Sequence, residues 1–202
     1  MKILHIDSSI QGELSVSRRL SAAIVARLQE VSPESIVIYR DLASEPLPHF
    51  SSDVVAAMQQ IGESDKERHV ASPLCDALDE LMHADTLVIG APMYNFSVPT
   101  QLKSWLDAIA VPGTTFSYGP EGVKGLLGDK RVIVASARGG LYGPDSAAAS
   151  AEHHETYLRS FFGFLGVTKF EIIRAEGVRM SPEIAEQAIG EAMTQVSQLL
   201  AA

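Results

Sequence analysis

MKILHIDSSIQGELSVSRR, residues 1–19, decides the fold because a strand pattern in it gives way to a helix pattern. The apolar run Ile3–Ile6 predicts a short strand, and the serines of Ser15–Ser17 are typical of a helix N-terminus. Such an N-terminus presents unpaired backbone N–H groups and the positive end of the helix dipole. Ser9 adds a hydroxyl donor without adding charge. The pattern favours either a site for one phosphate group or an ordinary helix N-cap.

The same loop lacks the motifs that bind larger phosphorylated ligands. It contains no G-x-G-x-x-G, which the pyrophosphate of a dinucleotide favours, and no G-x-x-x-x-G-K-[ST], which holds a nucleoside triphosphate. No cysteine is followed six residues later by arginine here, so the loop is not that of a cysteine phosphatase. A single phosphate monoester is the ligand class that suits it.

Length and composition predict one globular domain over residues 1–202. The formal net charge of −9 argues against a nucleic-acid or anionic membrane surface, because both need clustered Lys and Arg. The lone cysteine, Cys75, cannot form an internal disulfide, which favours a reducing cytoplasm, and its helical context predicts a buried position. No apolar run approaches the ~20 residues of a membrane span, so we expect a cytoplasmic protein.

Short apolar runs alternate with segments of helical period along the chain. The runs predict five strands: Ile3–Ile6, Ile36–Tyr39, Thr86–Gly90, Arg131–Ser136 and Lys169–Arg174. This alternation indicates a parallel sheet with helices on both faces. The irregular stretch 42–84 predicts a loop, a short helix near Asp53–Ile61 and a crossover helix that ends near His83. With five strands, the doubly wound order 2-1-3-4-5 places the binding crevice between the first and third strands.

Two further loops follow the third and fourth predicted strands. The loop Gly90–Pro99 combines Met93 and Asn95 with two aromatic residues, which can enclose a flat heteroaromatic ring; the alternative is a plain loop with Ser97 as N-cap. Three glycines within residues 139–143 let backbone approach a ligand closely, or else form a surface turn. Because the carboxyl ends of parallel strands share one edge, we expect all three loops to converge on one crevice.

These segments resemble the three FMN-binding segments of the FMN-dependent NADH-azoreductases, also called NADH:quinone oxidoreductases. The resemblance covers essentially the whole chain and implies a flavodoxin-like α/β fold, a three-layer sandwich with a five-stranded parallel sheet in the order 2-1-3-4-5. It also implies one FMN per subunit. The implied cofactor-binding residues are Ser9, Ser15, Val16 and Ser17 at the phosphate, Pro92, Met93, Tyr94, Asn95 and Phe96 around the isoalloxazine, and Ala137, Arg138, Gly139 and Gly140 at its pyrimidine edge. Family members often carry serine at the position of Ala137.

The resemblance implies transfer of two electrons from NADH, with NADPH also possible, to a quinone or an azo compound in a ping-pong cycle. The cofactor supplies this chemistry, so no catalytic residue and no metal is implied. His153 and His154 point apart on a helix and are expected at the surface, whereas His5 is expected as a hydrogen-bonded core residue. The alternatives are a flavodoxin-type electron carrier and a flavin reductase that releases reduced FMN.

A homodimer with the flavin near its interface is also implied by the resemblance. Adjacent residues on a helix cannot both face the same core, so either Phe161 or Phe162 should be exposed or covered by a partner subunit. The resemblance places Tyr118, Phe161 and Phe162 on the substrate side of the cleft.

Overall fold

Strands and helices alternate along the part of the chain that the computed structural model describes, which is residues 1–49, 51–52, 54–55 and 65–200. The elements, in chain order, are β1 (Lys2–Asp7), the 3₁₀ turn η1 (Gly12–Leu14), α1 (Val16–Val31), β2 (Ile36–Asp41), α3 (Asp65–His83), β3 (Thr86–Pro92), α4 (Thr100–Ile109), β4 (Phe116–Gly119), β5 (Gly122–Gly125), β6 (Arg131–Arg138), the 3₁₀ turn η2 (Ala149–Ala151), α5 (Glu155–Phe164), β7 (Lys169–Glu176) and α6 (Pro182–Ser197).

Five parallel strands form the central sheet in the order β2-β1-β3-β6-β7. Counted among the parallel strands alone, this is the predicted order 2-1-3-4-5. Each predicted strand was too short at its carboxyl end, since the strands run on to Asp7, Asp41, Pro92, Arg138 and Glu176. The antiparallel hairpin of β4 and β5, between α4 and β6, was not predicted.

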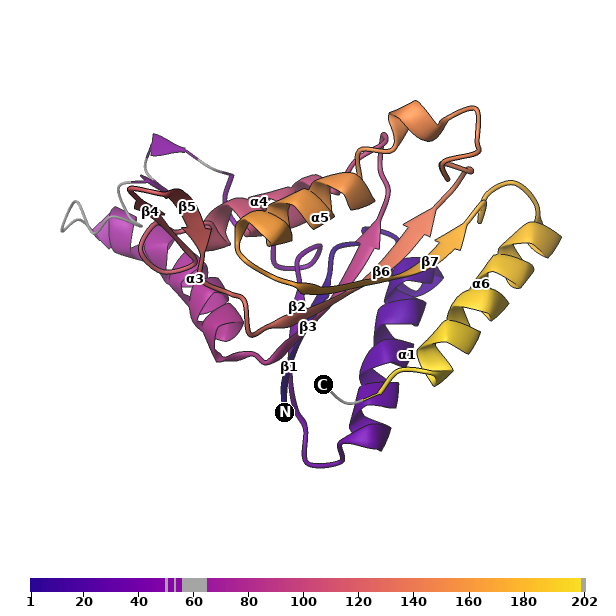
Figure 1. Ribbon diagram of the computed structural model, residues 1–202, viewed down its shortest axis with the longest axis horizontal. Helices are drawn as coiled ribbons and strands as arrows, with labels where there is room; N and C mark the ends of the chain where they lie inside the picture. Colours follow the sequence, from indigo (N-terminus) through magenta and orange to yellow (C-terminus); the bar gives the residue numbers. More distant parts are fainter. Residues whose placement is uncertain (50, 53, 56–64, 201–202) are drawn as a thin grey trace.

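Helices cover both faces of the sheet (Figure 1). Neighbouring residues of β1 show why: Leu4 belongs to the core shared with α3, α4 and α5, whereas Ile3 belongs to the core shared with α1 and α6. Strand side chains alternate between faces, so an apolar run that is buried on both faces needs a helix layer on each. Trp105 of α4 and Phe162 of α5 are fully buried in the first of these cores.

The carboxyl ends of β1, β3 and β6 lie side by side and place three loops at one edge. Ser8 N–H donates to Gly90 O at 3.2 Å, and Met93 N–H donates to Ala137 O at 2.8 Å. Gly90 is required at this crossing because a Cβ there would lie 2.1 Å from Asp7 Oδ1. The sheet therefore fixes the spacing of the loops that form the candidate site.

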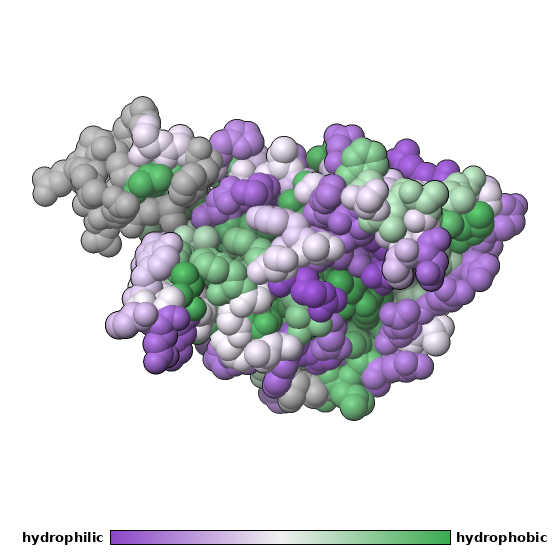
Figure 2. Space-filling view, turned by 45° about the horizontal axis from the view of Figure 1, so that its top comes forward, coloured by the Kyte–Doolittle hydropathy of each residue, from purple (hydrophilic) through white to green (hydrophobic). Residues whose placement is uncertain are grey.

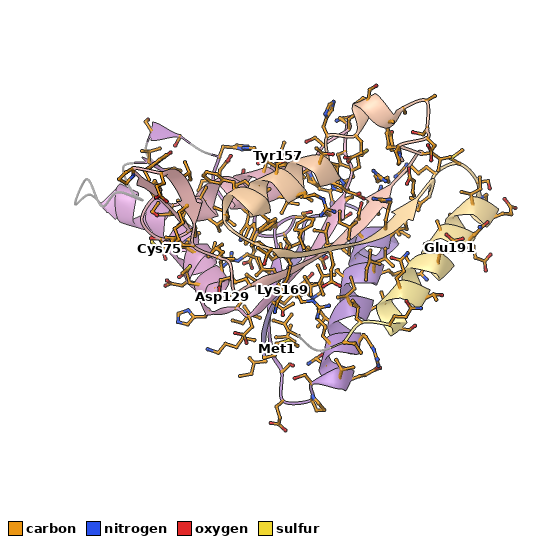
Figure 3. The ribbon with its side chains drawn as sticks, in the orientation of Figure 1. Met1, Cys75, Asp129, Tyr157, Lys169 and Glu191 are labelled. Atoms are coloured by element: carbon orange, nitrogen blue, oxygen red, sulfur yellow. The ribbon has the colours of Figure 1, made fainter. Side chains whose placement is uncertain are left out.

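Two predictions about the segment between β2 and β3 have different outcomes. The crossover helix is confirmed, since α3 ends at His83 as expected, whereas the short helix near Asp53–Ile61 lies mostly outside the described residues. The prediction that Cys75 is buried is wrong, because it lies exposed on α3 (Figure 3). No described helix combines the length and apolarity that a bilayer span requires.

Candidate functional site

The first loop joins β1 to the N-terminus of α1. Ser15 caps the helix, because its Oγ accepts from Arg18 N–H at 3.3 Å. The Oγ atoms of Ser15 and Ser17 lie 3.1 Å apart, and both residues are buried. The N–H groups of Val16 and Ser17 belong to the first helical turn, which has no intrahelical acceptor for them. The start of α1 thus offers two hydroxyls and two amide N–H groups, none of which is charged.

Arg18 connects this loop to β2 through hydrogen bonds. Its Nε and Nη2 donate to Ser9 O at 3.2 and 2.8 Å, and its Nη1 and Nη2 donate to the two carboxylate oxygens of Asp41 at 2.8 and 2.7 Å. The hydrogen bond from Arg18 lowers the pKa of Asp41. The Tyr39 hydroxyl accepts from the same guanidinium. Burial raises the pKa of Tyr39 to about 12. The first loop is therefore tied to the end of β2. Arg18 was not among the predicted site residues.

The second loop makes a tight turn after β3. Tyr94 N–H donates to Ser97 O at 2.9 Å, and Ser97 N–H donates to Tyr94 O at 3.1 Å. Between them, Asn95 and Phe96 have φ angles of 47° and 72°, in the left-handed region. A bulky residue there is strained by about 1–3 kcal/mol, and such strain concentrates at functional sites. The turn leaves the Phe96 ring half exposed at the wall of the cleft.

The third loop follows β6 and is fixed by backbone bonds to the segment after β7. Gly139 O accepts from Arg179 N–H, and Gly140 O accepts from Gly177 N–H, both at 3.1 Å. Glu176 accepts from Tyr142 N–H and also from Gly143 N–H at 3.0 Å. These contacts hold the loop backbone in place before any ligand arrives.

Arg138 belongs to the segment expected at the flavin edge, but its side chain does not line the cleft. Its side chain is 1% exposed, and Nη2 donates to Glu176 Oε2 at 2.9 Å. Glu152 and Glu155 lie 3.6 and 3.8 Å from the same guanidinium. A buried cation requires such partners, so Arg138 anchors the loop from the inside.

The three loops enclose a cleft of about 530 Å³. It is lined by ten of the thirteen residues predicted to bind the cofactor: Ser15, Val16, Ser17, Pro92, Met93, Tyr94, Asn95, Phe96, Ala137 and Gly139. Ser9, Arg138 and Gly140 are not among the lining residues; the Ser9 hydroxyl lies 3.2 Å from the Tyr94 hydroxyl instead. The cleft also includes residues that the sequence reasoning missed, which are Ile10, Gln11, Tyr142, Val178 and Arg179. Val178 and Arg179 follow a predicted parallel strand, and this position was the sequence signal that could have identified them.

The aromatic residues predicted on the substrate side do not line the cleft of this chain. Phe162 is 0% exposed in the core, and Phe161 is only partly buried. Of the pair, Phe161 is therefore the one that faces outward. Tyr118 is 74% exposed on the β4–β5 hairpin, and its ring packs edge-on to Phe116 at 5.5 Å.

The histidines divide between a confirmed prediction and a wrong one. His5 is buried with its Nε2 3.0 Å from Ser21 Oγ, as expected of a satisfied core residue. His153 is exposed, but His154 is 0% exposed, so the expectation of two surface histidines is wrong for His154. Its burial could not be deduced from adjacent residues. The described residues contain no group of three or more His, Cys, Asp or Glu side chains placed to hold a metal.

Residues 1–200 match a family described as having a flavodoxin-like fold. The chain belongs to this family. It is 51% identical over 203 residues to the FMN-dependent NADH:quinone oxidoreductase of Methylorubrum populi, and 49% identical over 202 residues to FMN-dependent NADH:quinone oxidoreductase 2 of Bradyrhizobium diazoefficiens; both alignments cover 100% of each chain. These relatives confirm the resemblance seen in the sequence.

Solved structures show the same likeness. The azoreductase AzrA superposes with a TM-score of 0.89 at 30% identity, covering 98% of both chains. An FMN-dependent NADH-azoreductase from Bacillus anthracis, solved in complex with FMN, superposes with a TM-score of 0.86 at 28% identity, again over 98% of both chains.

Proposed function

We propose that this protein is an FMN-dependent oxidoreductase that transfers two electrons from NADH to quinones and azo compounds. The observation that carries the proposal is the convergence of three loops on one cleft, in a chain half identical to FMN-dependent NADH:quinone oxidoreductases. One loop offers uncharged hydrogen-bond donors and the other two offer apolar and amide surfaces. These two kinds of surface match a ligand with a phosphate at one end and a flat ring at the other.

The phosphate of FMN would be held at the start of α1. The hydroxyls of Ser15 and Ser17 and the first-turn N–H groups supply donors, and the helix dipole supplies positive potential. Arg18 acts on this subsite through Ser9, whose carbonyl it holds in place. It is therefore a positioning residue.

The ring of FMN would lie between the Met93–Phe96 turn and the backbone of Ala137 and Gly139. Asn95 offers both an amide donor and a carbonyl acceptor, which suits a ring edge that carries both kinds of group. Bound FMN would supply the two-electron chemistry. The protein's own residues would bind the ring, orient it and shield it from water, with donor and acceptor entering the same cleft in turn.

Assembly as a homodimer completes the proposal. Apolar side chains lie exposed on the β4–β5 hairpin, on the segment after it and at the end of α5: Tyr118, Val123, Leu126 and Phe164. Hydrophobic side chains are also visible among polar ones on the face drawn in Figure 2. Leaving such area in water costs roughly 25 cal/mol per Å², which a second subunit would recover. Sedimentation of the active protein as a monomer at micromolar concentration would contradict this.

Steady-state kinetics test the reaction. We expect the purified protein to oxidise NADH with a soluble quinone in the absence of a partner protein, and initial-rate lines at several quinone concentrations to be parallel. A requirement for a partner protein would favour an electron carrier, and loss of flavin on gel filtration would favour a flavin reductase. Intersecting lines would contradict the shared cleft.

Replacement of serines tests the phosphate subsite. Ser15→Ala with Ser17→Ala should weaken FMN binding by at least about tenfold, because each hydrogen bond to a charged group contributes about 1.5–3 kcal/mol. Ser181→Ala is the matched control, since Ser181 caps α6 in the same way but does not line the cleft. Equal FMN affinity in the double variant and the control would refute the assignment.

A further inference from the structure

Arg179 is the only formally charged side chain among the described residues that line the cleft. It enters from the loop between β7 and α6, where its backbone N–H donates to Gly139 O. Its Cβ, Cγ and Cδ atoms pack over Gly139, each 3.5 Å from where a Cβ on that glycine would lie. The base of the side chain is therefore anchored at the wall formed by the third loop.

The guanidinium of Arg179 has no ion pair or side-chain hydrogen bond with any described residue, and the residue is exposed. The other arginines around the loops are committed: Arg18 to Asp41, Arg138 to Glu176 and Arg174 to Glu155. Arg179 alone keeps its donors available at the cleft.

Arg179 belongs to a different loop from the proposed phosphate subsite. That subsite lies at the start of α1, whereas the stem of Arg179 packs over Gly139 of the third loop. The proposed function places the third loop at the ring of FMN, so the charge is assigned to the ring side of the cleft rather than to the phosphate.

A positive charge at the cleft changes how readily anionic molecules approach it. The chain carries a formal net charge of −9, which disfavours the approach of anionic molecules. A guanidinium at the mouth of the cleft counters this locally and can bind a carboxylate or sulfonate with two parallel hydrogen bonds.

We infer that Arg179 forms an anion subsite at the rim of the cleft, which favours electron acceptors that carry a carboxylate or sulfonate next to the reducible group. This inference rests on the proposed function and adds the substrate class. The guanidinium binds the anionic substituent, and the acceptor's flat ring lies against the aromatic wall that Phe96 and Tyr142 form with their rings 6.1 Å apart.

A matched pair of acceptors tests the subsite: 1,4-naphthoquinone and 1,4-naphthoquinone-2-sulfonate, with NADH as donor at low ionic strength. The measured quantity is the ratio of kcat/KM for the sulfonate to kcat/KM for the neutral quinone. We expect Arg179→Gln to lower this ratio about five- to tenfold, and Arg179→Glu to lower it further. Arg179→Lys should restore only part of it, because lysine keeps the charge but not the two parallel hydrogen bonds. Added salt should shrink the difference between wild type and Arg179→Gln.

Lys169→Gln is the control for net charge. Lys169 is exposed at the opposite end of β7 (Figure 3), so its replacement removes one positive charge far from the cleft. The control should keep the wild-type ratio. An equal change in both variants would overturn the inference, because net charge alone would then explain the effect.

Binding provides a second readout that does not depend on turnover. Titration of the oxidised holoenzyme with the sulfonate, followed by flavin absorbance, should give a dissociation constant about five- to tenfold larger in Arg179→Gln. An unchanged constant, or an equal loss for both quinones, would overturn the anion subsite while leaving the proposed function intact. Failure of the wild type to bind FMN or to reduce either quinone would overturn the proposed function and this inference with it.

Discussion

His154 should make the protein acid-sensitive through a single buried imidazole. The side chain is 0% exposed, and neither ring nitrogen has a hydrogen-bond partner among the described residues. Burial lowers its pKa from the ordinary value of 6.5 to about 4, against the opposing effect of the Glu155 and Glu152 carboxylates. Between these two values the unfolded chain binds a proton that the folded chain excludes. Stability is therefore lost as the pH falls from 6.5 towards 4.

The size of this loss follows from the two pKa values. At pH 5, about 97% of unfolded chains carry a proton on His154 but only about 9% of folded ones do, which favours unfolding by about 2 kcal/mol. At pH 7.5 both states are almost fully neutral and the difference nearly vanishes. His154 alone thus contributes about 2 kcal/mol to the change in unfolding free energy between these pH values.

Urea denaturation of the wild type and His154→Gln at pH 7.5 and 5.0 measures this contribution. The variant should lose about 2 kcal/mol less between the two pH values than the wild type does, whatever its stability at either one. Titrations common to both proteins cancel in this comparison. His153→Gln, which changes the exposed neighbour, should behave like the wild type. Equal losses in wild type and His154→Gln would refute the reasoning, as would a measured pKa near 6.5 for His154.

Other substitutions test the buried core, the hydrogen bonds of Arg18 and the turn after β3 in turn. Phe162→Ala should destabilise the fold by about 3–5 kcal/mol because Phe162 is fully buried, whereas Phe161→Ala should cost clearly less in thermal denaturation but loosen the dimer in sedimentation. Arg18→Gln should weaken FMN binding, and Arg18→Lys should not restore it. Only a guanidinium can hydrogen-bond to Ser9 O and to both carboxylate oxygens of Asp41 at once. Full rescue of FMN affinity by lysine would contradict this role of Arg18. Asn95→Gly should keep the turn, since glycine accepts the φ of 47°, but should lower FMN affinity; unchanged affinity would remove the amide from the site.

Local patterns in the sequence determined the strands, the parallel sheet and the three loops. A run such as Thr86–Gly90 is apolar on both faces, which by itself requires two helix layers. The serines at the start of α1 and the Pro92–Phe96 segment were likewise recognisable from residue type and spacing. Ten predicted cofactor residues line the cleft because a parallel sheet brings the loops after its strands to the same edge.

Tertiary structure alone decided which way individual side chains face. Arg138 lies in a glycine-rich loop that reads as ligand-binding, yet it turns inward because three glutamates from distant segments compensate its buried charge. His154 is buried and Cys75 is exposed, and neither position follows from residue type or local spacing. Arg179 reaches the cleft only because the loop after β7 is hydrogen-bonded to Gly139. Backbone patterns depend on residues close in sequence, whereas the burial of one polar side chain depends on partners that only the folded chain brings together.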